Sequence, residues 1–181
     1  VAISGVGDLS HSLLILAATQ VITPSTGVIR AAQIAGLLYV GRNVVQVAAS
    51  YPIGVLADRY GDRVVLVAGY ALGALTAALT ALAFMARIDG FTILLGIFFV
   101  AGLYAAVQEA LEATVTAGMV SPETLATGYG ALGTVNGAAK FISSSAVGVL
   151  WTIASPMVGF GLAAVLMGIG VLGALLAKTP E

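Results

Sequence analysis

Long apolar runs follow one another along this chain, separated only by short breaks. Sixty per cent of the residues are hydrophobic and 8% are charged, whereas a soluble domain carries about 25% charged residues. So few charges cannot cover a water-exposed surface, and we expect an integral membrane protein. The runs reach about twenty residues, which suits transmembrane helices, while the strands of a membrane barrel alternate apolar and polar residues over about ten.

The breaks between the runs divide the chain into six spans. They fall at turn signals such as Thr23-Pro24, Arg87–Gly90 and Ser155-Pro156. A chain of 181 residues has room for six helices at about twenty residues each. We therefore predict an all-α membrane protein with a single six-helix domain over residues 1–181. The expected spans are residues 1–22, 28–57, 64–86, 91–120, 123–153 and 157–177.

A short charged segment joins the second and third runs. Its four charges lie within six positions: Asp58, Arg59, Asp62 and Arg63. No Asp, Glu, Lys or Arg occurs in residues 43–57 or 64–86 on either side. Gly54 and Gly61 allow a tight turn and a close approach of helices. Such a segment is typical of a short connection at a membrane surface.

This segment, Gly54–Leu66, resembles the signature loop of the major facilitator superfamily of secondary transporters. The matching residues are Gly54, Leu56, Ala57, Asp58, Arg59, Gly61, Arg63 and Leu66. Asp62 stands where the family usually has a basic residue. The resemblance implies a cytoplasmic loop with a role in gating for Gly54, Asp58, Arg59, Gly61 and Arg63. In that role Asp58 and Arg59 form a latch in one conformational state. A polar hairpin without a special role is the alternative.

Further residues resemble the C-terminal half of such transporters. The sequence from Glu109 to Glu112 and the loop segment from Met119 to Gly130 resemble the tenth helix of bacterial members and the loop after it, although Ala126-Thr127 replaces Arg-Gly. The fold implied is one half of a twelve-helix protein, built from two three-helix repeats. The partners implied are a second six-helix half, in the same polypeptide or another copy, and the lipid bilayer. The location implied is a bacterial inner membrane.

Polar side chains inside the runs are the candidate functional residues, because charges in hydrocarbon are costly and usually face the interior of a bundle. Nine such residues lie in four of the runs: Asp8 and His11; Arg42, Asn43 and Gln46; Glu109 and Glu112; Asn136 and Lys140. Residues three or four apart share one helix face, so each of these helices has a polar stripe. Residues 64–86 and 157–177 have no such stripe, and we expect them to be supports that face lipid.

The depth of the charged residues in their runs predicts that they meet in the half of the bundle nearest Gly54–Leu66. Their charges nearly balance, which makes burial tolerable. A carboxylate released from an Arg or Lys partner as the bundle rocks can carry a proton, and histidine titrates near neutral pH. We expect all nine residues to serve substrate or proton coupling, with Glu109 and Arg42 foremost. The amides also suit hydrogen bonds between helices, and a static polar lock is the alternative for the whole set.

Other classes of function find little support in the sequence. The chain has no Cys and one His, which argues against thiol chemistry and a zinc site. Its net charge of −1 gives no case for nucleic acid. We expect no cofactor, no metal and no enzymatic activity, but a small-molecule or ion substrate. The hypotheses are a transporter half, a half-size transporter that works as a homodimer, and a membrane anchoring or assembly domain without transport.

Overall fold

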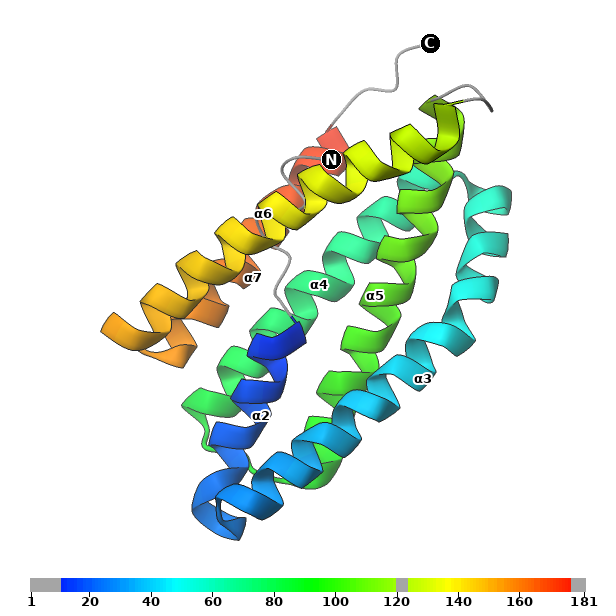
Figure 1. Ribbon diagram of the computed structural model, residues 1–181. Coiled ribbons are helices and arrows are strands. Elements are labelled where there is room, and N and C mark those ends of the chain that lie inside the picture. Colours follow the sequence, from blue (N-terminus) through cyan, green and yellow to red (C-terminus); the bar gives the residue numbers. More distant parts are fainter. Residues whose placement is uncertain (1–10, 120–123, 177–181) are drawn as a thin grey trace.

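The computed structural model describes residues 11–119 and 124–176, and these residues are almost entirely helical (Figure 1). The all-α prediction is confirmed. The helices are α2 (His11–Thr26), α3 (Val28–Tyr60), α4 (Asp62–Met85), α5 (Phe91–Met119), α6 (Leu125–Ile153) and α7 (Pro156–Leu176).

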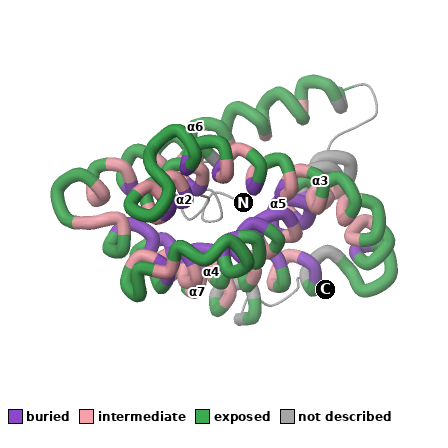
Figure 2. The backbone as a smooth tube through the Cα atoms, turned by 90° about the horizontal axis from the view of Figure 1, so that it is seen from below, coloured by how far each residue is buried: buried purple, intermediate pink, exposed green. Residues whose placement is uncertain are grey.

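The helices pack side by side in a bundle with α4 and α5 near its middle. The most extensive pairings are α4 with α7 and α3 with α5, and α5 also packs on α4. Figure 2 shows buried residues gathered toward the inside, while α6 is exposed along most of its length. The two helices whose apolar runs carry no charge, α4 and α7, therefore pack on each other, and both still expose aliphatic side chains such as Leu75 and Val165.

Single glycines make two of the turns. Gly27 at φ 80° separates α2 from α3, and Gly61 at φ 87° separates α3 from α4. This left-handed region of backbone conformation is open to glycine at no steric cost. The Gly61 N–H donates to the Ala57 carbonyl at 2.9 Å, which closes the last turn of α3. The helical conformation therefore continues through Asp58 and Arg59, and the charged segment turns at one residue.

Helix α2 runs past the break expected at Thr23-Pro24 and ends only at Thr26. Proline removes one backbone N–H from the helix. Hydroxyl groups next to it bond back to the preceding turn, Thr23 to the Thr19 carbonyl at 2.6 Å and Ser25 to the Ile22 carbonyl at 2.9 Å. These bonds satisfy carbonyls of the last turn, and the chain reverses at Gly27 instead.

Two segments of the described residues are long and apolar enough to cross a membrane, Val64–Met85 and Phe91–Leu111. Ser12–Thr26 and Pro156–Leu172 are apolar but shorter. Helices α3 and α6 are long, with 33 and 29 residues, but polar side chains interrupt both of them. The prediction of six membrane spans is therefore not confirmed and stays a prediction.

An aromatic cluster of Phe84, Trp151 and Phe160 joins α4, α6 and α7. The ring centroids of Trp151 lie 5.7 Å from those of both phenylalanines, in edge-on arrangements. The rings of Phe84 and Phe160 stack at 6.1 Å. Such pairs contribute about 0.5–1.5 kcal/mol each beyond the area they bury, so this cluster ties α6 and α7 to α4.

Replacing Phe160 by alanine is expected to destabilise the protein by about 3 kcal/mol, because a fully buried aromatic ring leaves a cavity. Phe160 is 0% exposed. Phe141→Ala on α6 is the matched control, since the Phe141 side chain is 74% exposed. Reversible unfolding in detergent measures both free energies. Equal losses in the two variants would contradict a structural role for the cluster.

Candidate functional site

The face of α3 that packs on α5 contains an arginine in place of an apolar residue. The buried residues of α3 include Ala31, Ala35, Leu38 and Arg42, spaced four, three and four apart. This spacing places them on one face of the helix. Arg42 is only 4% exposed. The sequence thus places a guanidinium where the contact between the two helices would otherwise be apolar.

Helix α5 meets α3 at this level with no side chain between the backbones. A Cβ atom on Gly102 would lie 2.7 Å from the Arg42 carbonyl oxygen and 2.9 Å from the Val45 Cβ. Both distances are shorter than real contacts, so only glycine fits here without movement of a helix. Gly102 therefore sets the separation of α3 and α5 beside Arg42.

The Arg42 guanidinium binds amide oxygens on its own helix. Its Nη1 donates to Asn43 Oδ1 at 2.8 Å and also to Gln46 Oε1. Charge-assisted bonds of this kind are among the stronger hydrogen bonds in proteins. They supply part of the polar environment that a buried cation needs.

Gln46 continues this set of bonds across to α5. Its Nε2 donates to Glu109 Oε1. Gln46 is half-buried and Glu109 is exposed. Arg42, Gln46 and Glu109 therefore form one continuous chain of hydrogen bonds, with a cation at its buried end and a carboxylate at its accessible end. We call these three residues the α3–α5 polar bridge.

A family model described as Major Facilitator Superfamily matches residues 3–181. The chain belongs to this superfamily. Its members are membrane transporters, not enzymes; they sit in lipid and bind small-molecule substrates. No curated protein matches the sequence.

The residues that resemble the superfamily's signature loop lie at the junction of α3 and α4. Asp58 and Arg59 are exposed in the last turn of α3, and the Arg59 Cζ lies 5.6 Å from the centroid of the Tyr60 ring. Gly54 is half-buried and lies in α3, two residues after Pro52. Figure 1 shows that α3 bends along its length, as expected of a helix with an internal proline. Arg63 lies in α4, but its side chain is outside the described part of the structure.

The other expected site residues are only partly described. Asn136 and Lys140 are half-buried on α6, and each has an interaction partner. Asp8 lies outside the described residues, and so do the side chains of His11 and Glu112. Of the charged residues expected to meet, Arg42 and Glu109 are joined through Gln46 in the described part of the structure. A meeting of the others with this pair stays a prediction.

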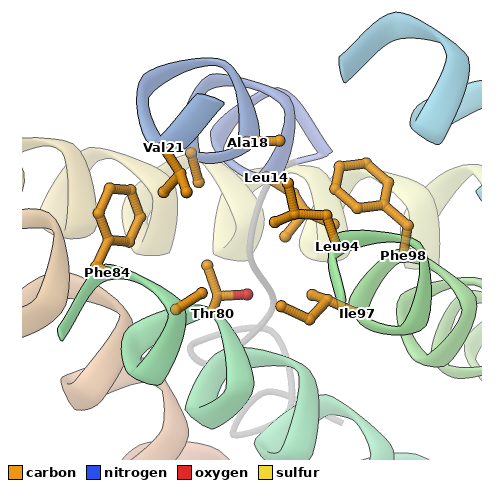
Figure 3. Close-up of a pocket in the computed structure, with 10 residues that line it drawn as sticks. Leu14, Ala18, Val21, Thr80, Phe84, Leu94, Ile97 and Phe98 are labelled. Carbon is orange, nitrogen blue, oxygen red and sulfur yellow. The ribbon is translucent and has the colours of Figure 1, made fainter. Parts of the chain in front are cut away.

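An apolar pocket lies between α2, α4 and α5, away from the polar bridge (Figure 3). Leu14, Val21, Phe84 and Phe98 point toward one another around it, and Thr80 is its polar member. The Thr80 hydroxyl donates to the Thr76 carbonyl at 2.8 Å. The pocket volume of about 10 Å³ has room for about one water molecule. It is therefore too small to hold a solute, and the polar bridge is the better candidate.

Gly102→Ala is expected to push α5 away from α3 and to destabilise the protein by about 1–3 kcal/mol, as overpacking of a close contact does. Gly96→Ala on the same helix is the matched control, because a Cβ there meets nothing within 4 Å. Thermal unfolding in lipid nanodiscs compares the two. The assignment is wrong if Gly102→Ala unfolds at the same temperature as the control.

Proposed function

We propose that this chain is one six-helix half, the C-terminal one, of a secondary active transporter. It moves a small solute across the membrane by alternating access and couples this movement to a proton or another ion. Membership of the superfamily supports transport. The observation that carries the coupling site is the α3–α5 polar bridge, because it connects an accessible carboxylate to a buried cation through one amide side chain, across two neighbouring helices.

Relative movement of α3 and α5 gives this arrangement a coupling mechanism. The bond between Gln46 and Glu109 crosses from one helix to the other, so it must break when the two helices separate. Glu109 then loses this partner, and it regains the partner when the helices come together again, so the bonding of the carboxylate follows the conformation of the bundle. A membrane anchor would gain nothing from such a pair of charges.

The proposal also assigns roles to the other polar residues, to the end of α3 and to a second six-helix half. Asp8, His11, Glu112, Asn136 and Lys140 complete the polar interior in this proposal. Asp58 and Arg59, at the end of α3, form the latch on the cytoplasmic side of a bacterial inner membrane. The second half of the transporter comes from the same polypeptide or from another copy of this chain.

Glu109→Gln and Arg42→Gln are each expected to reduce solute-driven proton movement about ten- to hundredfold. The loss of one hydrogen bond to a charged group costs about 1.5–3 kcal/mol, and each 1.4 kcal/mol is about tenfold. The full chain is placed in liposomes that contain a pH-sensitive dye, and a panel of small solutes is added outside. The internal pH reports coupled transport.

Asp89→Asn and Arg87→Gln are the matched controls, because both residues are exposed in the connection between α4 and α5. They make the same chemical changes far from the polar bridge in sequence and should leave proton movement intact. Equal activity of the Glu109 and Arg42 variants would remove the coupling assignment. If neither a solute nor an imposed proton gradient produced any flux with the unaltered protein, the proposal of transport would fail as a whole.

The native mass of the protein in detergent tests whether the second six-helix half is another copy of this chain or part of the same polypeptide. A half-size transporter that works as a homodimer should give a stable particle with two copies, which keeps its mass on dilution. A particle with one copy would rule out the homodimer. The measurement should be made on the unaltered chain and repeated in lipid nanodiscs, where dimers of membrane helices are better preserved.

A further inference from the structure

The side chains of the α3–α5 polar bridge use hydrogen-bond donors on one another. Arg42 Nη1 donates to the amide oxygens of Asn43 and Gln46, and Gln46 Nε2 donates to Glu109 Oε1. A guanidinium carries only donors and an ionised carboxylate only acceptors. The bridge therefore begins with donors at its buried end and ends with acceptors at its exposed end, where a ligand would approach.

Glu109 has accepting capacity that the described residues do not use. Its two carboxylate oxygens together can accept about four hydrogen bonds, and Gln46 supplies one of them, to Oε1. The other oxygen, Oε2, accepts no hydrogen bond from the residues that the structure describes. A carboxylate inside an apolar run is costly unless it meets a partner. Because Glu109 is exposed, a donor from outside the chain can reach it.

Gln108, the neighbour of Glu109 on α5, offers a second acceptor. Its Nε2 donates to the hydroxyl of Tyr104, which lies about one turn back. Its Oε1 accepts no hydrogen bond within the described part of the chain. Every buried side-chain oxygen and nitrogen of the described residues has a partner, so this oxygen of the half-buried Gln108 side chain is accessible.

One ligand can meet both acceptors. Successive residues of a helix point about 100° apart, so Gln108 and Glu109 lie on adjoining sides of α5. Side chains of a helix lean toward its N-terminus, and these two therefore lean toward the same level of the bundle. An ammonium group carries three N–H donors, which diverge. One of them can reach the carboxylate while another reaches the amide oxygen.

We propose that Glu109 Oε2 and Gln108 Oε1 bind an organic cation with N–H donors, such as a protonated primary amine, and that this is the class of solute the protein moves. The inference rests on the proposed function, for which it names the substrate class. Hydrogen bonds between charged groups are roughly twice as strong as neutral ones. An ammonium therefore gains more at Glu109 than a neutral hydroxyl or amide does.

Binding of the cation at Oε2 leaves the rest of the bridge in place. Gln46 stays on Oε1, and Arg42 keeps its bonds to Asn43 and Gln46. The carboxylate then stands between the buried guanidinium, which it meets through one amide, and the ammonium of the ligand. The buried cation is not stranded, which would be strongly destabilising.

Other classes of ligand suit this end of the bridge less well. An anionic solute needs an accessible cation, whereas the Arg42 side chain is 4% exposed and holds amide oxygens. A calcium ion takes about six oxygen ligands or more, and no group of three or more His, Cys, Asp or Glu in the described ranges could hold a metal ion. The two acceptors therefore favour positive charge and N–H donors together.

The test measures binding alone, by calorimetry on the full chain in lipid nanodiscs, and empty nanodiscs give the uptake by lipid that is subtracted. The probes share one apolar group: phenethylammonium, its trimethylammonium derivative, phenethyl alcohol and phenylpropanoate. Phenethylammonium should bind about tenfold or more tightly than each of the others, as a hydrogen bond to a charged group provides. The trimethylammonium derivative keeps the charge and lacks the N–H donors, so it isolates their contribution.

Two variants test the assigned residues. Glu109→Gln should weaken phenethylammonium binding about ten- to hundredfold, because it removes the charged acceptor. Gln108→Leu should weaken it about two- to tenfold, because it removes a neutral acceptor. Asp89→Asn and Gln33→Leu are the matched controls at exposed positions, and both should bind like the unaltered chain.

Several results would overturn the proposal. They are equal affinity for phenethylammonium and any of the other probes, unchanged affinity in Glu109→Gln, and displacement of the probe by sodium ions but not by potassium ions, which would indicate a metal-ion site. Thermal unfolding in nanodiscs checks that each variant is folded. The comparison of probes on the unaltered chain decides the ligand class even if a variant is not folded.

Binding and transport give separable results. If phenethylammonium is preferred and depends on Glu109 while no solute drives proton movement in liposomes, the coupling assignment fails and the ligand class of the site stands. If other solutes drive proton movement while phenethylammonium is not preferred, the ligand class fails and the proposed function stands.

Discussion

The contact between α3 and α5 at Gly102 is the constraint on which the candidate site depends. It brings a glycine Cα against a backbone carbonyl, so the spacing of the helices is set by main chain and not by adaptable side chains. The Arg42 carbonyl belongs to the same contact, and the Arg42 side chain is buried. A cation buried in this way needs polar partners, and Asn43 and Gln46 supply them from the same helix. Gln46 then connects the buried charge to Glu109.

Much of this arrangement could be predicted from the sequence. Charged residues inside apolar runs are costly, and their spacing of three or four residues indicated which faces meet. That reasoning singled out Arg42, Gln46 and Glu109, and the structure joins these three. The pattern around Gly54–Leu66 indicated the superfamily, and the family match confirms it.

The remainder depends on features that one sequence does not carry. Gly102 is one of 23 glycines, and nothing in its neighbours marks it as the residue that touches another backbone. The bridging role of Gln46 depends on the register of two helices that are far apart in the sequence. The continuation of α2 past Pro24 depends on hydroxyl groups that bond locally, so proline alone was a misleading signal of a break.

The one-residue junction at Gly61 has a mechanical consequence. Consecutive Cα atoms lie about 3.8 Å apart, so the junction between Tyr60 and Asp62 contains almost no slack. Any tilt of α3 must be absorbed by backbone rotation at Gly61, or α4 must tilt with it. Helix α4 has its most extensive contact with α7. A displacement of α3 beside Arg42 can therefore reach α7 through α4, with Gly61 as the one flexible point between α3 and α4.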